Sequence, residues 1–230
     1  MIRPAAVVAL LSFASSAALA ACGNTDEPYK PAPAWSGKKA NLPPPPTLST
    51  TPIKAGDAYT IFGAVHQLRS RYHTKDVTKD PITITGYIVE SNIPDAPECA
   101  IHPTGKQDPD NCTPPIPSFW IADTKGDTKG LKIRVIGWAR NFAVVYDAIK
   151  KYNSVKEPPK ELVKDETLSV DVPFPLPAVG AKVKITGKYG VTWSGGSDLV
   201  SDPQTGVMAF QKLDYLEKAP ELAEFKAKKL

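Results

Sequence analysis

The sequence predicts a mainly β domain with one helix between the third and the fourth of five strands. Five segments alternate apolar and polar residues and are rich in β-branched and aromatic side chains. One stretch between the third and fourth segments has the apolar spacing of a helix. Prolines, glycines and aspartates separate the segments, which is typical of loops and turns. The predicted strands are residues 82–89, 119–123, 131–138, 180–189 and 207–216.

The first three strands follow from this alternation. The first contains Gly86 at its centre, where a strand can bend or bulge. The second, Phe-Trp-Ile-Ala-Asp, is followed by a Gly- and Asp-containing turn at residues 125–130. In the third, alternation places Leu131, Ile133 and Val135 inside the domain.

The helix is predicted to begin after Asn141, a residue type that caps helix N-termini. An apolar stripe and then two lysines at the favourable C-terminal end follow: Phe142, Val145, Tyr146, Ile149, Lys150 and Lys151. A short strand is expected at residues 168–172, and a short C-terminal helix from Pro220.

Residues 59–67 fit two interpretations. Alternate positions from Tyr59 to Val65 suit a strand, whereas the spacing of Ile61, Val65 and Leu68 suits a helix. The β-rich composition of Tyr-Thr-Ile-Phe-Gly favours the strand.

The order strand, strand, strand, helix, strand, strand resembles the OB-fold, a five-stranded Greek-key barrel. The resemblance covers residues 82–216, within a domain expected at residues 57–218. It implies that ligands lie across the second and third strands, between two long loops at residues 90–118 and 190–206.

The N-terminus has the layout of a secretory signal: a basic start at Arg3, an apolar run and the sequence Leu19-Ala20-Ala21-Cys22. This end resembles the bacterial lipobox, which implies a signal at residues 1–21 and an acylated Cys22 as the first mature residue. The resemblance implies lipid anchoring in a bacterial cell envelope. The alternative is an ordinary signal that leaves Cys22 as a free thiol.

Residues 22–56 are rich in proline and are expected to form an extended tether. Gly23 follows the cysteine, and similarity to enterobacterial lipoproteins then implies sorting to the outer membrane. Residues 219–230 form the tail.

Cys99 and Cys112 remain once Cys22 is assigned to lipid, and in an oxidising envelope they are expected to form a disulfide. The alternative is a metal site with the intervening His102 and acidic residues, but a fourth ligand at a standard spacing is missing. We therefore expect no metal and no cofactor.

The formal net charge is +4, and removal of the signal, whose one charged residue is Arg3, leaves +3. This small excess does not indicate nucleic-acid binding, so any basic surface must arise from local clustering. Alternation places Lys132, Arg134, Ile136 and Trp138 outside the barrel. The candidate ligand-binding residues are Trp120, Lys132, Arg134, Trp138, Lys184 and Trp193.

Cations beside indole rings suit an envelope polyanion, and the envelope location argues against nucleic acid. The alternative is a solvated lysine face with packed tryptophans. Common catalytic motifs are absent. We therefore expect a non-enzymatic binding module. The alternatives are a structural lipoprotein that binds a protein partner, and a hydrolase or nuclease that uses Asp123, Asp198 and Asp202.

Overall fold

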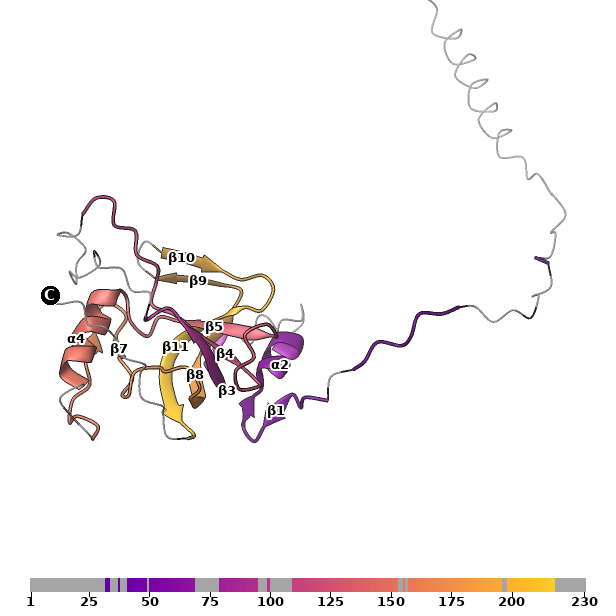
Figure 1. Cartoon of the computed structure of the whole chain (residues 1–230), viewed down its shortest axis with the longest axis horizontal. Coiled ribbons are helices and arrows are strands. Elements are labelled where there is room, and N and C mark those ends of the chain that lie inside the picture. Colours follow the sequence, from indigo (N-terminus) through magenta and orange to yellow (C-terminus); the bar gives the residue numbers. More distant parts are fainter. Residues whose placement is uncertain are drawn as a thin grey trace, which may run out of the picture. The chain divides into compact units, whose positions relative to one another are not determined.

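The computed structural model describes residues 32, 33, 37, 41–48, 50–68, 79–94, 99, 109–152, 155, 157–195 and 198–217 (Figure 1). The chain divides into two compact units, Met1–Thr47 and Leu48–Leu230. The described residues of the first unit are exposed and contain no helix or strand. No helix in the described part of the chain is long and apolar enough to cross a bilayer. Cys22 and the tail helix expected from Pro220 lie outside the described residues.

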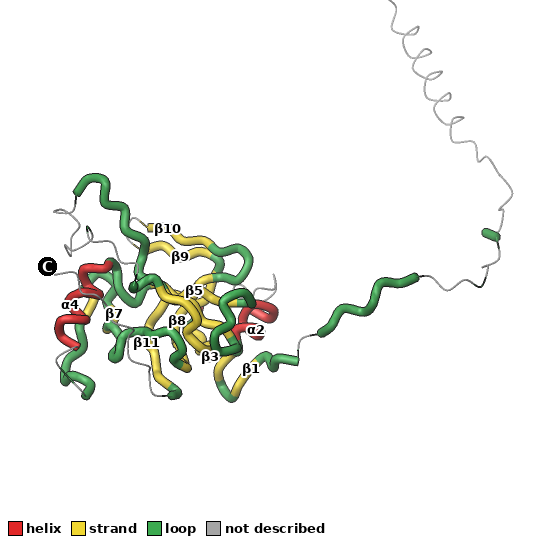
Figure 2. The backbone as a smooth tube through the Cα atoms, viewed as in Figure 1, coloured by secondary structure: helices red, strands yellow, loops and turns green. Residues whose placement is uncertain are grey.

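Five longer strands pair in a cycle within the described part of the second unit (Figure 2). They are β3 (Ile82–Ser91), β4 (Phe119–Ala122), β5 (Lys132–Ile136), β8 (Lys182–Gly190) and β11 (Val207–Tyr215). β3 pairs with β4, β4 with β5, β5 with β11, β11 with β8, and β8 with β3 again. Only the β5–β11 pair among these is parallel. The sheet is thus partly closed on itself, and the predicted mainly β class is confirmed.

Shorter strands decorate this sheet. β1 (Lys54–Ala55) and β2 (Ala58–Tyr59) form a small hairpin, and β2 adds to the sheet by parallel pairing with β3. β6 (Lys164–Asp165) pairs with β7 (Val170–Asp171), so a strand occurs within the expected range 168–172. The unit that contains these strands begins at Leu48, inside the range expected for the tether.

Helix α4 (Phe142–Tyr152) occurs between β5 and β8, as predicted. Asn141 Oδ1 accepts a hydrogen bond from the Val144 amide at 3.1 Å, which confirms the predicted N-cap. The apolar stripe packs into the core. At the C-terminal end, the Tyr152 hydroxyl donates to the Val172 carbonyl at 2.7 Å and accepts from the Val163 amide at 3.0 Å. These bonds fasten the helix to the chain that follows it.

The prediction of a strand at residues 59–67 is wrong. The chain leaves β2 at Tyr59 and forms a helical turn α2 (Ile61–Gly63) that continues as a π-helical turn η2 (Ala64–Leu68). The helical spacing buries Ile61, Val65 and Leu68 in the core.

The start of α2 is capped from two sides. The Thr60 hydroxyl accepts a hydrogen bond from the Gly63 amide at 2.8 Å. The Asp123 carboxylate, directly after β4, accepts hydrogen bonds from the amides of Ile61 and Phe62, each at 2.8 Å. Local composition favoured a strand, whereas this capping by a residue 62 positions away favours the helix.

The core fills the interior of the partly closed sheet. Residues that alternate inward along each strand are buried, for example Phe119 and Ile121 of β4 and Ile133 and Val135 of β5. Leu131, which was expected inside, lies before β5 begins and is 37% exposed.

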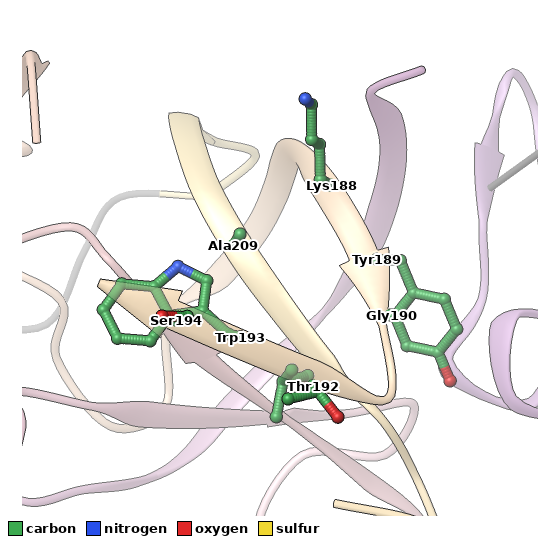
Figure 3. A pocket seen from close by; sticks show the side chains of 8 residues that line it. Lys188, Tyr189, Gly190, Thr192, Trp193, Ser194 and Ala209 are labelled. Carbon is green, nitrogen blue, oxygen red and sulfur yellow. The ribbon is translucent and has the colours of Figure 1, made fainter. Parts of the chain in front are cut away.

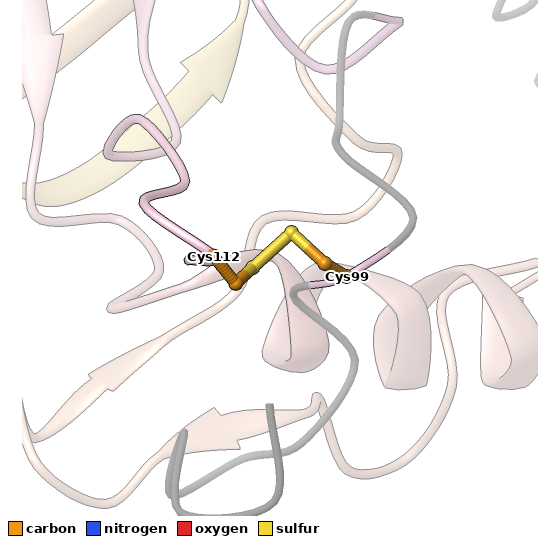
Figure 4. Close-up of a disulfide and its surroundings, with 2 residues drawn as sticks. All are labelled: Cys99 and Cys112. Carbon is orange, nitrogen blue, oxygen red and sulfur yellow. A yellow bond between two sulfur atoms is a disulfide. The ribbon is translucent and has the colours of Figure 1, made fainter. Parts of the chain in front are cut away.

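The predicted disulfide is present: Cys99 and Cys112 are bonded, with their Cα atoms 5.8 Å apart (Figure 4). The base of the same loop is closed by Asn92. Its Nδ2 donates to the Ile116 carbonyl at 2.8 Å, and its Oδ1 accepts from the Ser118 amide at 2.7 Å. Two crosslinks therefore hold the described parts of the loop between β3 and β4.

Replacement of Asp123 tests the long-range cap. Asp123→Ala leaves two amide donors of α2 without their partner, so we expect the free energy of unfolding to fall by about 2 kcal/mol in urea titrations. Asp214→Ala is the control, because the Asp214 carboxylate contacts, among the described residues, only Lys212, in a surface ion pair at 2.8 Å. Its removal is expected to cost less than about 0.5 kcal/mol. Equal losses in the two variants would contradict the capping role.

Candidate ligand-binding face

Five residues, one from each longer strand, form a row on the outer face of the sheet, which we call the outer row. Strand register pairs Glu90 with Trp120, Trp120 with Arg134, Arg134 with Val207, and Val207 with Gly190. Trp120 and Arg134 are partly exposed, whereas their neighbours along each strand are buried. Two predicted site residues, Trp120 and Arg134, are thus direct cross-strand neighbours.

The Arg134 side chain is held in one orientation. Its guanidinium carbon lies 5.4 Å from the centre of the Trp120 ring. Its Nε and Nη2 donate to the Ser118 hydroxyl at 3.0 and 2.8 Å, and Ser118 is fully buried. Partial burial lowers the pKa of Arg134, while the negative charge of Asp202 opposes that shift. The guanidinium remains charged at neutral pH.

Lys132 extends this face but is already paired. Its ammonium lies 2.6 Å from Glu90 Oε1, and it also donates to the Thr128 carbonyl at 3.1 Å. Because both members of the ion pair are on the outer face, Lys132 adds little net positive charge there.

Lys184 is not part of the same site. Its ammonium lies 2.7 Å from Asp57 Oδ1. Along β8 it is about 20 Å from Gly190 of the outer row, at about 3.3 Å per residue. The structure therefore does not bring Lys184 together with Trp120 and Arg134.

Trp138 is not on the face, contrary to the prediction. It is fully buried, with its ring centre 6.2 Å from that of Phe119. The reason is Gly137, whose φ of 79° ends the extended strand, so the alternation predicted for 131–138 stops before Trp138. Ile136, also expected outside, is fully buried. Trp138 supports the core rather than a binding surface.

The loop predicted at residues 190–206 instead contains a hairpin, β9 (Thr192–Gly195) paired with β10 (Asp198–Ser201). Trp193 on β9 places its indole beside Gly137, where an added Cβ would lie 3.4 Å from Nε1. An added Cβ at Gly195 would lie 2.1 Å from the same indole, so only glycine leaves room for it. Sequence reasoning found Trp193, but neither glycine.

A pocket of about 200 Å³ opens beside this hairpin (Figure 3). Trp193, Thr192 and Ser194 line it from β9, and Lys188 and Gly190 from β8. Val207 of the outer row also lines the pocket, together with Ala209. The pocket therefore continues the outer row beyond Arg134. Alternation along residues 180–189 predicts that Lys188 points outward, like Lys182 and Lys184, and Lys188 is indeed exposed. The small residues of the pocket were not identified from the sequence.

The chain after the hairpin is fixed by Asp202. Its Oδ1 accepts from the amides of Gln204 and Thr205 at 2.9 Å each, and its Oδ2 accepts from the Thr205 hydroxyl at 2.8 Å. Burial alone raises the pKa of Asp202, but the hydrogen bonds from Thr205, Gln204 and Gly206 outweigh it, and the net pKa is lowered.

The carboxylates proposed for hydrolysis have other roles. Asp123 caps α2 and Asp202 fixes its own turn, while the Asp198 side chain lies outside the described part. Among the described residues, no group of three or more His, Cys, Asp or Glu side chains is arranged to hold a metal ion.

The lowered pKa of Asp202 predicts a pH-dependent stability difference. A group whose pKa is lower in the folded state stabilises the fold above its unfolded pKa, near 3.8, and loses this effect as the pH falls through the folded pKa. We expect wild type to be more stable than Asp202→Asn at pH 7, and this difference to shrink below about pH 4. Urea titrations at both pH values measure it. A difference that is the same at pH 7 and pH 3 would contradict the assignment.

Known proteins do not identify the ligand of this face. The chain matches no family model, and it matches no curated protein. The chemical character of the ligand has to be inferred from the outer row and the hairpin.

Proposed function

We propose that this protein is a lipoprotein of a bacterial cell envelope whose barrel domain binds an envelope glycan without transforming it. The anchor is supported by the sequence Leu19-Ala20-Ala21-Cys22 after an apolar run. Residues 41–47 are exposed and contain no helix or strand, which is compatible with a tether, here proposed to be residues 22–47. We further propose sorting to the outer membrane, on the basis of Gly23.

The barrel is proposed to be of the OB type. Support comes from the cyclic pairing of β3, β4, β5, β11 and β8, and from the position of α4 between β5 and β8. In such barrels the second and third strands carry the ligand, between the first and last loops of the barrel. Here those strands are β4 and β5, which carry Trp120 and Arg134.

The ordered pair of Trp120 and Arg134 carries the proposal. An indole partly covered by a fixed guanidinium offers an apolar surface next to hydrogen-bond donors, and OB barrels bind oligosaccharides as well as oligonucleotides. A sugar ring has an apolar face and a rim of hydroxyl groups, which matches this surface.

The charge balance favours a glycan over a nucleic acid or another highly charged polyanion. Binding to a phosphate backbone depends on several cations that are free to contact it. On this face Lys132 is paired with Glu90, and Arg134 contacts Ser118 and is close to Asp202. A ligand that carries few charges therefore fits better.

Substitution of Cys22 tests the anchor. We expect wild type to incorporate labelled palmitate and to fractionate with membranes, and Cys22→Ser to lose the label and become soluble, because the lipid anchor is absent. Cys99→Ala with Cys112→Ala is the control, and this variant should keep the label. Palmitate on Cys22→Ser would contradict the lipoprotein assignment.

Substitution of the outer row tests the binding function. The mature Cys22→Ser chain, with its disulfide oxidised, is titrated with peptidoglycan fragments, an acidic glycan, lipopolysaccharide and a single-stranded oligonucleotide. We expect saturable glycan binding that weakens by about tenfold in Trp120→Ala and in Arg134→Gln, since loss of a central aromatic contact or of a charged hydrogen bond typically costs more than about 1 kcal/mol.

Lys212→Gln is the matched control for this titration, because Lys212 lies on β11 in a surface ion pair with Asp214. Its glycan affinity should equal that of wild type. Thermal melts check that each variant is folded. Affinity that is unchanged in both outer-row variants, or preferential binding of the oligonucleotide with steep salt dependence, would contradict the proposal.

A further inference from the structure

The pocket beside the hairpin has the size of one ring. Its volume of about 200 Å³ is below the 300–1,000 Å³ that is usual for drug-sized ligands. The hollow exists because Gly190 of β8 has no side chain and Ala209 of β11 has only a methyl group on the outer face. Larger residues such as Trp120 and Arg134 occupy the outer face of β4 and β5.

The groups that line the pocket differ in chemistry and have few competing contacts. Trp193 is partly buried, and its Nε1 donates no hydrogen bond to the described residues. Lys188 is exposed and forms no ion pair with a described residue, unlike Lys132, Lys182 and Lys184. Ser194 is exposed on the same strand as Trp193. Figure 3 shows these side chains around Ala209.

We infer that this pocket binds one sugar ring that carries a carboxylate. The apolar face of the ring lies against the Trp193 indole, a hydroxyl group accepts from the indole N–H, and its carboxylate pairs with Lys188. The pocket is too small for a nucleoside together with its phosphate. One cation matches one acidic group.

This inference rests on the proposed glycan-binding function and extends it in space. Val207 lines the pocket and is the register partner of Arg134, so adjacent strands separate the two sites by only about 4.8 Å. A chain of sugar rings can therefore place its acidic residue beside Trp193 and the next ring over Arg134 and Trp120. The pocket then selects glycans that carry a carboxylate, and the outer row supplies further contacts with the neighbouring sugar ring.

The test compares an acid with its own methyl ester. The probes are the trimer of galacturonic acid, a tetrasaccharide of alternating N-acetylglucosamine and N-acetylmuramic acid, and the methyl ester of each. Titration calorimetry and tryptophan fluorescence of the mature Cys22→Ser chain report affinity. We expect at least one acid to bind about tenfold more tightly than its ester, because only the acid forms the charged hydrogen bond with Lys188.

Variants assign this preference to the pocket. Lys188→Gln should bind the acid and the ester equally, whereas Lys212→Gln, a matched lysine on β11, should keep the tenfold preference. Trp193→Ala should weaken both probes, and Trp193→Phe should restore part of the affinity. Ala209→Leu, which fills the pocket, should lose both.

The outcomes separate this inference from the proposed function. If Arg134→Gln weakens acid and ester alike while Lys188→Gln leaves the preference for the acid intact, glycan binding stands and the pocket assignment is overturned. Equal affinity of wild type for acid and ester also overturns it, as does the absence of binding by both acids. Loss of the preference in Lys188→Gln alone supports it.

Discussion

Pairing of β3 on both of its edges is the constraint on which the rest of the structure depends. β3 contacts β4 over its second half and β8 over its first, and this double pairing closes the cycle of strands. Gly86 of β3 allows the close approach of β4, because a Cβ there would lie 2.8 Å from the Ala122 carbonyl oxygen. Gly187 of β8 allows the close approach of β11, because a Cβ there would lie 2.0 Å from the Ala209 oxygen. The row from Glu90 to Gly190 crosses the strands of this cycle.

The closed arrangement also explains why the outer face is nearly neutral around three of its cations, whereas Lys188 has no ion pair with a described residue. Another strand or loop supplies an acidic group near each of the three: Glu90 of β3 for Lys132, Asp57 for Lys184, and the turn of Asp202 near Arg134. Neighbouring opposite charges stabilise a face that would otherwise repel itself, although each exposed pair adds little. What remains distinctive is the geometry of Arg134 between Ser118 and Trp120, and the hollow next to it.

Local patterns in the sequence predicted the parts of the fold that depend on local periodicity. The main strands and α4 were located to within a few residues, and Asn141 was identified as a cap, because alternation and capping are read from neighbouring residues. The disulfide followed from the cysteine spacing and the expected envelope location. Of the candidate binding residues, Trp120, Lys132 and Arg134 do share one face.

The errors at residues 59–67 and at Lys184 have long-range causes, whereas the error at Trp138 has a local one. The capping of Ile61 by Asp123 and the pairing of Lys184 with Asp57 join residues 62 and 127 positions apart, so composition near Ile61 could not reveal the helix. Trp138 was misplaced because one positive φ at Gly137 ends the alternation.

In the described chain β10 pairs with β9 alone, and an isolated two-stranded hairpin is marginally stable in water. It can therefore open, and exchange its amide hydrogens, while the barrel stays folded. A sugar ring bound between Trp193 and the barrel would raise the free energy of hairpin opening once the ligand concentration exceeds the Kd. Binding of the ligand in the pocket would then be coupled to the folding of the hairpin.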